Sequence, residues 1–177
     1  VASTYGEKFI NNGDEILITE LEHHANYVPW HFIREKKGVN IKFARCNDKG
    51  EVEIDEIKKL ITNKTKIIAI THLSNVTGAI LPVKKIVDLA KTKNIPVLVD
   101  GCQAAPHFKI DMQELGCDFY AFSCHKMYGP TGVGVLYAKK KWLDKLPPYQ
   151  GGGGMIEEVK KDKITFPESP TKYEAGT

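Results

Sequence analysis

The sequence predicts an α/β fold in which a mostly parallel sheet is flanked by helices. Strand-like and helix-like hydrophobic patterns alternate along its 177 residues, as they do in proteins built from strand–helix–strand units. Apolar runs such as 67–70 and 97–99 are continuous, which indicates strands covered on both faces. Polar residues follow several of these strands, at the edge where parallel sheets bind their ligands. We therefore expect one site at that edge.

Strands and helices are expected in alternation in the first half of the chain. Residues 15–19 form an apolar strand. Residues 26–37 form a helix that closes at Gly38, because glycine is common just past a helix end. The period of the apolar residues assigns the other elements. They are an alternating strand at 40–46, an amphipathic helix at 54–61 and a buried strand at 66–71.

The second half continues the alternation. Residues 83–93 have apolar side chains at Val83, Ile86, Val87 and Ala90, a spacing typical of a helix with one buried face. Strands follow, and the first of them ends in an acidic residue. These strands cover residues 95–100, 117–123 and 132–138.

The composition of the chain changes after residue 146. Two prolines and a run of glycines at 151–154 mark a flexible loop, and residues 156–166 are expected to form a short hairpin. The glycine run fits a linker and a loop at the edge of a site equally well. We therefore divide the chain into a core over residues 1–150, truncated at its N-terminus, and a loop with a hairpin over residues 151–177. The start at Val1 without a methionine indicates a segment of a longer protein.

Composition argues against several functional classes. The net charge is only +3 and the lysines are scattered, so we expect no nucleic-acid partner. The apolar runs are too short to span a membrane, and the start does not resemble a secretory signal. The four cysteines include no Cys-x-x-Cys pair, so neither a metal site nor a disulfide framework is expected. A reducing compartment fits, which is the cytoplasm or, in a eukaryote, the stroma or matrix of an organelle.

Two strand-terminal segments combine the residue types that pyridoxal phosphate (PLP) chemistry needs. Asp100 ends a buried strand, and Lys126 follows a later strand in the segment Ser-Cys-His-Lys. A lysine amine in a semi-enclosed pocket forms a Schiff base with the PLP aldehyde. A carboxylate facing the pyridine nitrogen keeps it protonated, so that the ring withdraws electrons from the substrate. Either residue alone is more often a surface charge or a helix cap.

Longer motifs extend this pattern across nearly the whole chain. They are E-H-H-A-N-Y-V-P-W at 22–30, H-L-S-N-V-T-G at 72–78, D-G-C-Q at 100–103, S-C-H-K-M-Y-G-P-T-G at 123–132 and G-G-G-G-M at 151–155. Together they resemble the class V aminotransferase superfamily, and within it the group II cysteine desulfurases of the SufS type. The resemblance implies that residues 1–150 are part of the large, PLP-binding domain of a fold-type I PLP enzyme.

The resemblance also assigns roles around the cofactor ring. It implies that Lys126 holds PLP as a Schiff base and shuttles protons, and that Asp100 pairs with the pyridinium nitrogen. Gln103 is implied to hydrogen-bond the phenolic oxygen of the ring. His23 is implied to stack on the ring face and to act as an acid or base, whereas its neighbour His24 is expected to be structural.

Further roles concern the phosphate and the substrate. By the same resemblance, Ser123 and His125 bind the phosphate, and Asn75 contacts the substrate carboxylate or the ring oxygen. Thr177 is implied to reach the phosphate of the other subunit in a homodimer. Cys102 and Cys124 lie beside these residues, and we interpret them as small space-fillers, as free cysteines often are. Trp30 and Tyr128 are expected to be packing residues.

The implied reaction is the conversion of L-cysteine to L-alanine, with the sulfur left as an enzyme persulfide. The persulfide is then passed to a sulfur-acceptor protein for iron–sulfur cluster assembly. The nearest alternative is a selenocysteine lyase, and a kynureninase-like hydrolase, an epimerase and a transaminase share the same fold. A catalytically inactive scaffold is a second class. A dehydrogenase is disfavoured, because no G-x-G-x-x-G motif opens a helix after an early strand.

Three parts that such an enzyme needs are missing from the sequence. A phosphate-binding Gly-Thr-Thr turn is expected before Val1, and the sulfur-accepting cysteine and a carboxylate-binding arginine after Thr177. Arg34 and Arg45, the two arginines present, fall in a predicted helix and a predicted strand away from the motifs. We therefore expect this segment to be inactive by itself.

Overall fold

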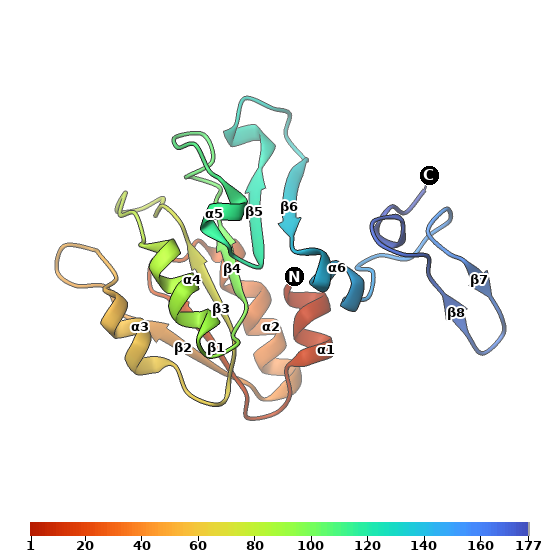
Figure 1. The fold of residues 1–177 in the computed structure, drawn as a ribbon, viewed down its shortest axis with the longest axis horizontal. Helices are drawn as coiled ribbons and strands as arrows, with labels where there is room; N and C mark the ends of the chain where they lie inside the picture. Colours follow the sequence, from red (N-terminus) through yellow and green to blue (C-terminus); the bar gives the residue numbers. More distant parts are fainter. Residues whose placement is uncertain (177) are drawn as a thin grey trace.

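A twisted sheet of six strands in the order β2-β1-β3-β4-β5-β6 forms the centre of the computed structural model, which describes residues 1–176 (Figure 1). The first five strands along the chain run parallel, and β6 pairs antiparallel with β5. Their bounds are β1 (Glu15–Thr19), β2 (Asn40–Ala44), β3 (Thr65–Thr71), β4 (Val97–Asp100), β5 (Phe119–Ser123) and β6 (Gly134–Ala138). The predicted α/β fold with a mostly parallel sheet is confirmed.

Helices cover both faces of this sheet. One face carries α3 (Ile54–Leu60), α4 (Val83–Lys91) and α5 (Met112–Leu115). The other face carries α1 (Glu7–Phe9), which continues a π-helix at Ala2–Gly6, together with α2 (Val28–Lys37) and α6 (Lys140–Lys145). The two layers can be followed in Figure 1.

Each inner strand contributes to both hydrophobic cores. In β1, Leu17 packs in the core beneath α3 and α4, whereas Ile16 and Ile18 pack in the core beneath α2. Successive side chains of a strand point to opposite faces, so a strand covered on both sides must be apolar throughout. This explains the continuous apolar runs of the sequence.

The ends of the elements differ slightly from the predicted ones. Helix α2 ends where expected, with Gly38 in the left-handed conformation at φ 67°, but its predicted first residue, Asn26, ends a separate 3-10 turn at His24–Asn26. The N-terminal helices, α5 and α6 have no counterpart among the predicted elements. They are short, and a few residues contain too little periodicity to identify a helix.

The C-terminal part forms the expected hairpin, with strands β7 (Glu158–Val159) and β8 (Ile164–Thr165). Figure 1 shows it standing apart from the sheet beyond α6. The hydroxyl of Tyr173 donates hydrogen bonds to the carbonyl oxygens of Leu143, at 2.6 Å, and Leu146, at 3.0 Å, which ties this part to the end of α6. The division at residue 150 stays a prediction.

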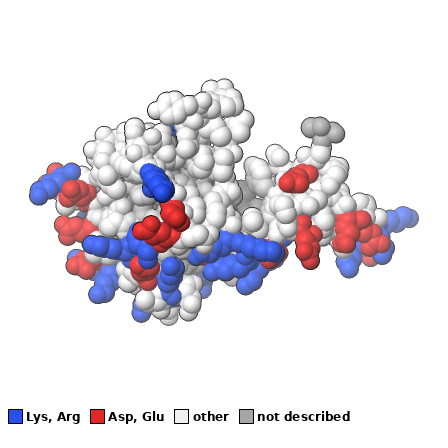
Figure 2. All heavy atoms as spheres, turned by 45° about the horizontal axis from the view of Figure 1, so that its top comes forward, with Lys and Arg blue, Asp and Glu red and all other residues white. Residues whose placement is uncertain are grey.

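Charged side chains of both signs are interspersed on the face shown in Figure 2, with a largely uncharged region above them. Within residues 1–176, no helix combines the length and the apolar character that crossing a bilayer requires.

Candidate functional site

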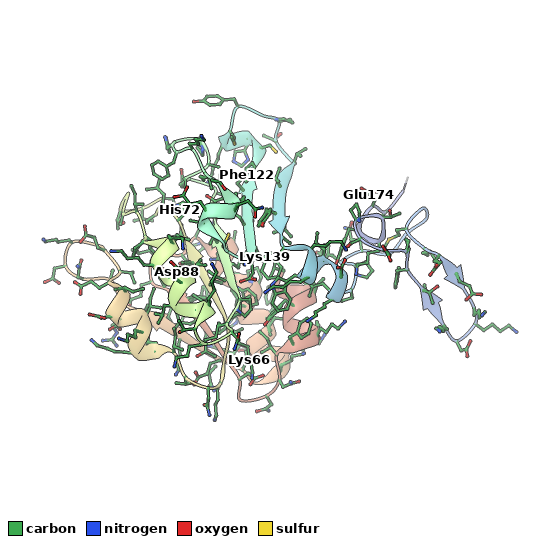
Figure 3. The ribbon with its side chains drawn as sticks, viewed as in Figure 1. Lys66, His72, Asp88, Phe122, Lys139 and Glu174 are labelled. Atoms are coloured by element: carbon green, nitrogen blue, oxygen red, sulfur yellow. The ribbon has the colours of Figure 1, made fainter. Side chains whose placement is uncertain are left out.

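The carboxyl ends of β1, β3, β4 and β5 meet around a cavity of about 220 Å³. Figure 3 shows His72, just after β3, and Phe122, near the end of β5, toward this edge, whereas Lys139 lies toward the opposite one. Each of these strand ends supplies side chains that the sequence had singled out. The cavity is lined by His23, Asn75, Asp100, Gln103, Ser123, His125 and Lys126. Thr177, the remaining predicted site residue, lies outside the described residues.

Asp100 is the last residue of β4 and has a fixed orientation. It pairs with Thr71 of β3 on one side and Ala121 of β5 on the other. Its Oδ1 accepts a hydrogen bond of 2.9 Å from the main-chain N–H of Cys102, which closes a turn directly after the strand. The carboxylate therefore faces the cavity from the centre of the sheet edge.

Gly101 lets this turn lie against the neighbouring strand. A Cβ atom at residue 101 would come within 1.9 Å of Cε1 and 2.1 Å of Cζ in the ring of Tyr120. No side chain fits at that distance, so glycine is required here for steric reasons. The Tyr120 ring is itself held by a hydrogen bond of 3.1 Å between its hydroxyl and Nδ1 of His72.

Lys126 lines the cavity from the short 3-10 turn Cys124–Lys126, which directly follows β5. The turn is closed by hydrogen bonds from the main-chain N–H groups of Met127, at 2.8 Å, and Gly129, at 2.9 Å, to the carbonyl oxygen of Cys124. Lys126 is half-buried, and its amine takes part in none of the ion pairs formed within residues 1–176. It is therefore available to a ligand.

His23 stands at the rim of the cavity. Its Nδ1 accepts a hydrogen bond of 3.1 Å from the main-chain N–H of Ala25, so that in the neutral ring the proton is carried by Nε2. Ala25 also lines the cavity. The preceding residue, Glu22, is partly buried, and its carboxylate accepts hydrogen bonds from Thr19, Asn26 and Thr71.

Cys102 lines the cavity between Asp100 and Ser123, with its Sγ 3.7 Å from the Ser123 hydroxyl. Burial and the neighbouring Asp100 charge raise the pKa of this thiol. A neutral thiol is a poor nucleophile, which agrees with the interpretation of Cys102 as a space-filler. Trp30 is buried as expected, but Tyr128 is 97% exposed and does not pack, because it occupies a surface turn with φ 59°.

A second cavity of about 380 Å³ adjoins the first and shares Ala25, Asp100 and Cys102 with it. It extends to Trp30 and Tyr149, so residues around position 150 lie near the site although the glycine run itself does not line it. Within the described residues, Arg34 and Arg45 line neither cavity, in line with the expectation that neither binds a substrate carboxylate there.

The side chains around the smaller cavity match the groups that PLP presents. An amine stands ready for the aldehyde, a carboxylate for the ring nitrogen, an amide for the ring oxygen, and a hydroxyl with an imidazole for the phosphate. Thr71, Leu73, Ala25 and Cys102 complete the wall, and no role had been predicted for Thr71, Leu73 and Ala25. These wall residues lie close to the predicted site residues because of the order of the strands, which the sequence does not show directly.

Comparison with known proteins agrees with this geometry. The family model for class-V aminotransferases matches residues 1–177. The chain belongs to the class-V aminotransferase family. This confirms the family that the sequence motifs resemble. It also confirms the predicted fold class, which is part of the large domain of a fold-type I PLP enzyme.

Relatives of this class-V aminotransferase chain are named as cysteine desulfurases. It is 49% identical over 177 residues to a probable cysteine desulfurase of Halalkalibacterium halodurans. It is 50% identical over 179 residues to a cysteine desulfurase of Wigglesworthia glossinidia brevipalpis. Each alignment covers the whole chain but 44% of the relative, so the chain spans less than half the length of these proteins.

Solved structures of this family superpose closely on the chain. The crystal structure of the cysteine desulfurase CsdA of Escherichia coli, described as S-sulfonic acid, matches with a TM-score of 0.95 and 42% identity over the whole chain and 44% of CsdA. A variant of C-DES with glycine covalently linked to its PLP cofactor matches with a TM-score of 0.81 and 27% identity, over 96% of this chain and 46% of C-DES.

Proposed function

We propose that the protein carrying this chain is a PLP-dependent cysteine desulfurase that converts L-cysteine to L-alanine. The observation that carries the proposal is the convergence of Lys126, Asp100 and five further predicted side chains on one cavity at the carboxyl edge of the sheet. The names of the relatives support the choice of substrate.

Bound PLP supplies an electron-withdrawing ring that stabilises negative charge at the substrate Cα. The residues of the chain bind this cofactor and orient it. Lys126 Nζ holds the cofactor covalently before the substrate enters and afterwards moves the Cα proton. Asp100 keeps a proton on the ring nitrogen, and its contact with the Cys102 N–H fixes the carboxylate in that position.

The remaining polar side chains position the cofactor and the substrate. Ser123 and His125 hold the phosphate, and Gln103 donates to the ring oxygen. His23 would cover the ring face, with its Nε2 proton available to the substrate, since Nδ1 accepts the Ala25 N–H. Asn75 contacts the substrate carboxylate or the ring oxygen.

The overall reaction transfers one sulfur atom between two thiols. L-cysteine and a protein thiol give L-alanine and a protein persulfide, so the Cβ–S bond of the substrate breaks as the S–S bond forms. We assign the accepting thiol to a residue outside this segment, because the pKa of Cys102 is raised and Cys124 does not line the cavity in the part of the chain that the structure describes. The substrate-binding arginine is assigned to the same missing part.

The subgroup and the partners are part of the proposal. The motifs at 22–30 and 123–132 favour a group II enzyme of the SufS type that acts as a homodimer, with Thr177 near the partner's phosphate. The persulfide sulfur would pass to an acceptor protein for iron–sulfur cluster assembly in the cytoplasm or an organelle.

The proposal is tested on the full-length protein with L-cysteine and a reductant, by measuring alanine and sulfide. The wild type should show the absorbance of protein-bound PLP and form both products. Lys126→Ala should lose the absorbance and form neither product. Asp100→Asn should retain PLP but turn over at least about 100-fold more slowly, as expected when a preorganised electrostatic contact is lost. Alanine formation from selenocysteine but not from L-cysteine would instead indicate a selenocysteine lyase. Near-normal turnover by either variant would contradict the assigned roles.

A further inference from the structure

Strands β1 and β3 separate just before the cavity. Their pairing ends at Ile18 and Ala69, and β1 ends at Thr19, whereas β3 continues to Thr71. The main-chain N–H of His72 faces β4, where it donates to the carbonyl oxygen of Asp100 at 2.9 Å. Alternate residues of a strand direct their N–H groups to opposite neighbours, so the N–H of Thr71 faces the side that β1 has left.

The carboxylate of Glu22 takes the place of the missing strand. Its Oε1 accepts the N–H of Thr71 at 2.9 Å and the hydroxyl of Thr19 at 2.6 Å. Its Oε2 accepts the side-chain amide of Asn26 at 2.6 Å. One side chain thus joins the end of β1, the end of β3 and the 3-10 turn His24–Asn26. A buried N–H without an acceptor is costly, so this replacement allows the strands to part.

The parting of the strands makes room for the rim of the site. His23 and Ala25, which lie in the sequence between the hydrogen-bonded residues Glu22 and Asn26, both line the cavity, and so does Thr71. Thr71 is also the register partner of Asp100 across the β3–β4 pair. The hydrogen bonds of Glu22 therefore form a short path between His23 and Asp100, which are proposed to contact the ring face and the ring nitrogen.

We propose that Glu22 is a positioning residue, whose carboxylate sets where His23 stands relative to Asp100. This inference rests on the proposed function for its ligand, since it is the PLP ring that His23 and Asp100 would both contact. The groups that contact the Glu22 carboxylate are the donors from Thr19, Asn26 and Thr71, and the carboxylate of Asp100 on β4 is the charged group that acts on it. Burial and, to a smaller extent, the Asp100 charge raise the pKa of Glu22 to about 7, against the effect of these donors.

Glu15 is a matched control on the same strand. It begins β1, at the end away from the cavity, and its Oε2 accepts the hydroxyls of Thr62 at 2.5 Å and Thr65 at 3.3 Å. Its carboxylate also pairs with Lys42 at 3.0 Å. Loss of either carboxylate should lower the thermal stability, but only the loss of Glu22 should change the site.

The test compares Glu22→Gln and Glu15→Gln in the full-length protein. Glutamine retains an oxygen for Thr71 but turns an amide N–H₂ toward the N–H₂ of Asn26. The Asn26 amide must then turn over and accept with its Oδ1, which disturbs the 3-10 turn after His23. In the PLP-free protein, the ¹⁵N resonances of the His23 ring, assigned by their loss in His23→Ala, should shift in Glu22→Gln and stay in Glu15→Gln. The dissociation constant of PLP should rise about tenfold in Glu22→Gln alone, the lower end of the loss seen when an outer partner is removed from a metal site.

Unchanged His23 resonances in Glu22→Gln, or equal shifts in both variants, would overturn the positioning role. If Glu22→Gln does not fold, Asn26→Ser breaks the same hydrogen bond from the other side, and the same resonances decide. A wild type that binds no PLP would refute the proposed function, whereas the His23 resonances of the PLP-free protein would still test the role of Glu22.

Discussion

Asp100 and Cys102 lie two residues apart on one turn and line the same cavity, yet their surroundings give them different chemistry. Asp100 accepts the main-chain N–H of Cys102, a contact that holds its carboxyl group in place at the end of β4. The thiol of Cys102 is partly buried beside that negative charge, and its pKa is therefore raised. At the scale of single residues, the sequence shows which groups are present, and the environment decides how each is held and how reactive the Cys102 thiol is.

Glu22 leads to a prediction about pH and stability. A carboxyl group whose pKa is higher in the folded than in the unfolded protein binds more protons when folded, so stability falls as the pH rises. The pKa of Glu22 rises from 4.5 to about 7, so the wild type should lose stability across this interval. Glu22→Gln removes this contribution, and the melting temperature of the variant should fall less between about pH 5 and about pH 8.

Differential scanning fluorimetry of the full-length wild type and variant over that pH range checks this expectation. Carboxyl groups with lowered pKa values, such as Glu15 and Asp118, are present in both proteins and cancel in the difference. Parallel pH profiles would show that Glu22 titrates at an ordinary pKa.

At the scale of elements, the position of the site depends on how β4 and β5 end. β4 stops at Asp100 and turns at once, and the turn is pressed against Tyr120 of β5. β5 continues to Ser123 and then forms the 3-10 turn that carries Lys126. The two elements are neighbours in the sheet, so both key side chains reach one cavity.

Gly101→Ala should disturb this arrangement. The added methyl group meets the Tyr120 ring, so either the ring or the Asp100 turn must move, with a cost in unfolding free energy of about 1–3 kcal/mol. Because the turn carries Asp100, PLP binding should also weaken. Urea denaturation and a PLP titration of the full-length protein measure the two effects.

Gly151→Ala is the control for this substitution. A Cβ at residue 151 meets nothing within 4 Å, and its backbone needs no positive φ. The control should keep wild-type stability and PLP affinity. A Gly101→Ala protein that matched it in both respects would show that the contact with Tyr120 is not tight in solution.

At the scale of the whole molecule, helix α6 joins parts that are far apart in the sequence. The ring of Trp142 packs against Tyr5, Phe9 and Phe119, with ring centroids 5.3, 5.8 and 5.8 Å away. Its indole Nε1 donates a hydrogen bond of 2.9 Å to Asp118, which also pairs with Lys139 and Lys141. This cluster holds the N-terminal helices and α6 to the sheet.

Trp142→Ala should destabilise the protein by about 2–3 kcal/mol, below the usual cost for a fully buried tryptophan because Trp142 is half-buried. Trp142→Phe keeps a ring and loses mainly the hydrogen bond to Asp118, so a loss of about 1 kcal/mol is expected. Urea denaturation of the full-length protein provides both values. Equal stability of the two variants would mean that the aromatic packing contributes little.

The strands and the larger helices were predictable because their patterns are local. β1 was predicted with its observed bounds, and α2 and α4 were found with their ends displaced by two residues at most. The short helices, α6 among them, were missed. The stability of α6 comes from Trp142 and its partners in other elements, which a local pattern does not contain.

The sequence by itself determined the alternation of elements and the chemical types at the strand ends, including Lys126 and Asp100. Side-chain period and residue type are properties of a few neighbouring residues, so they can be recognised without the fold. Only the tertiary structure decided that Glu22 accepts the N–H of Thr71, 49 residues away, and that Tyr120 lies against Gly101. Such contacts depend on the strand order and register, which arise when distant segments pack together.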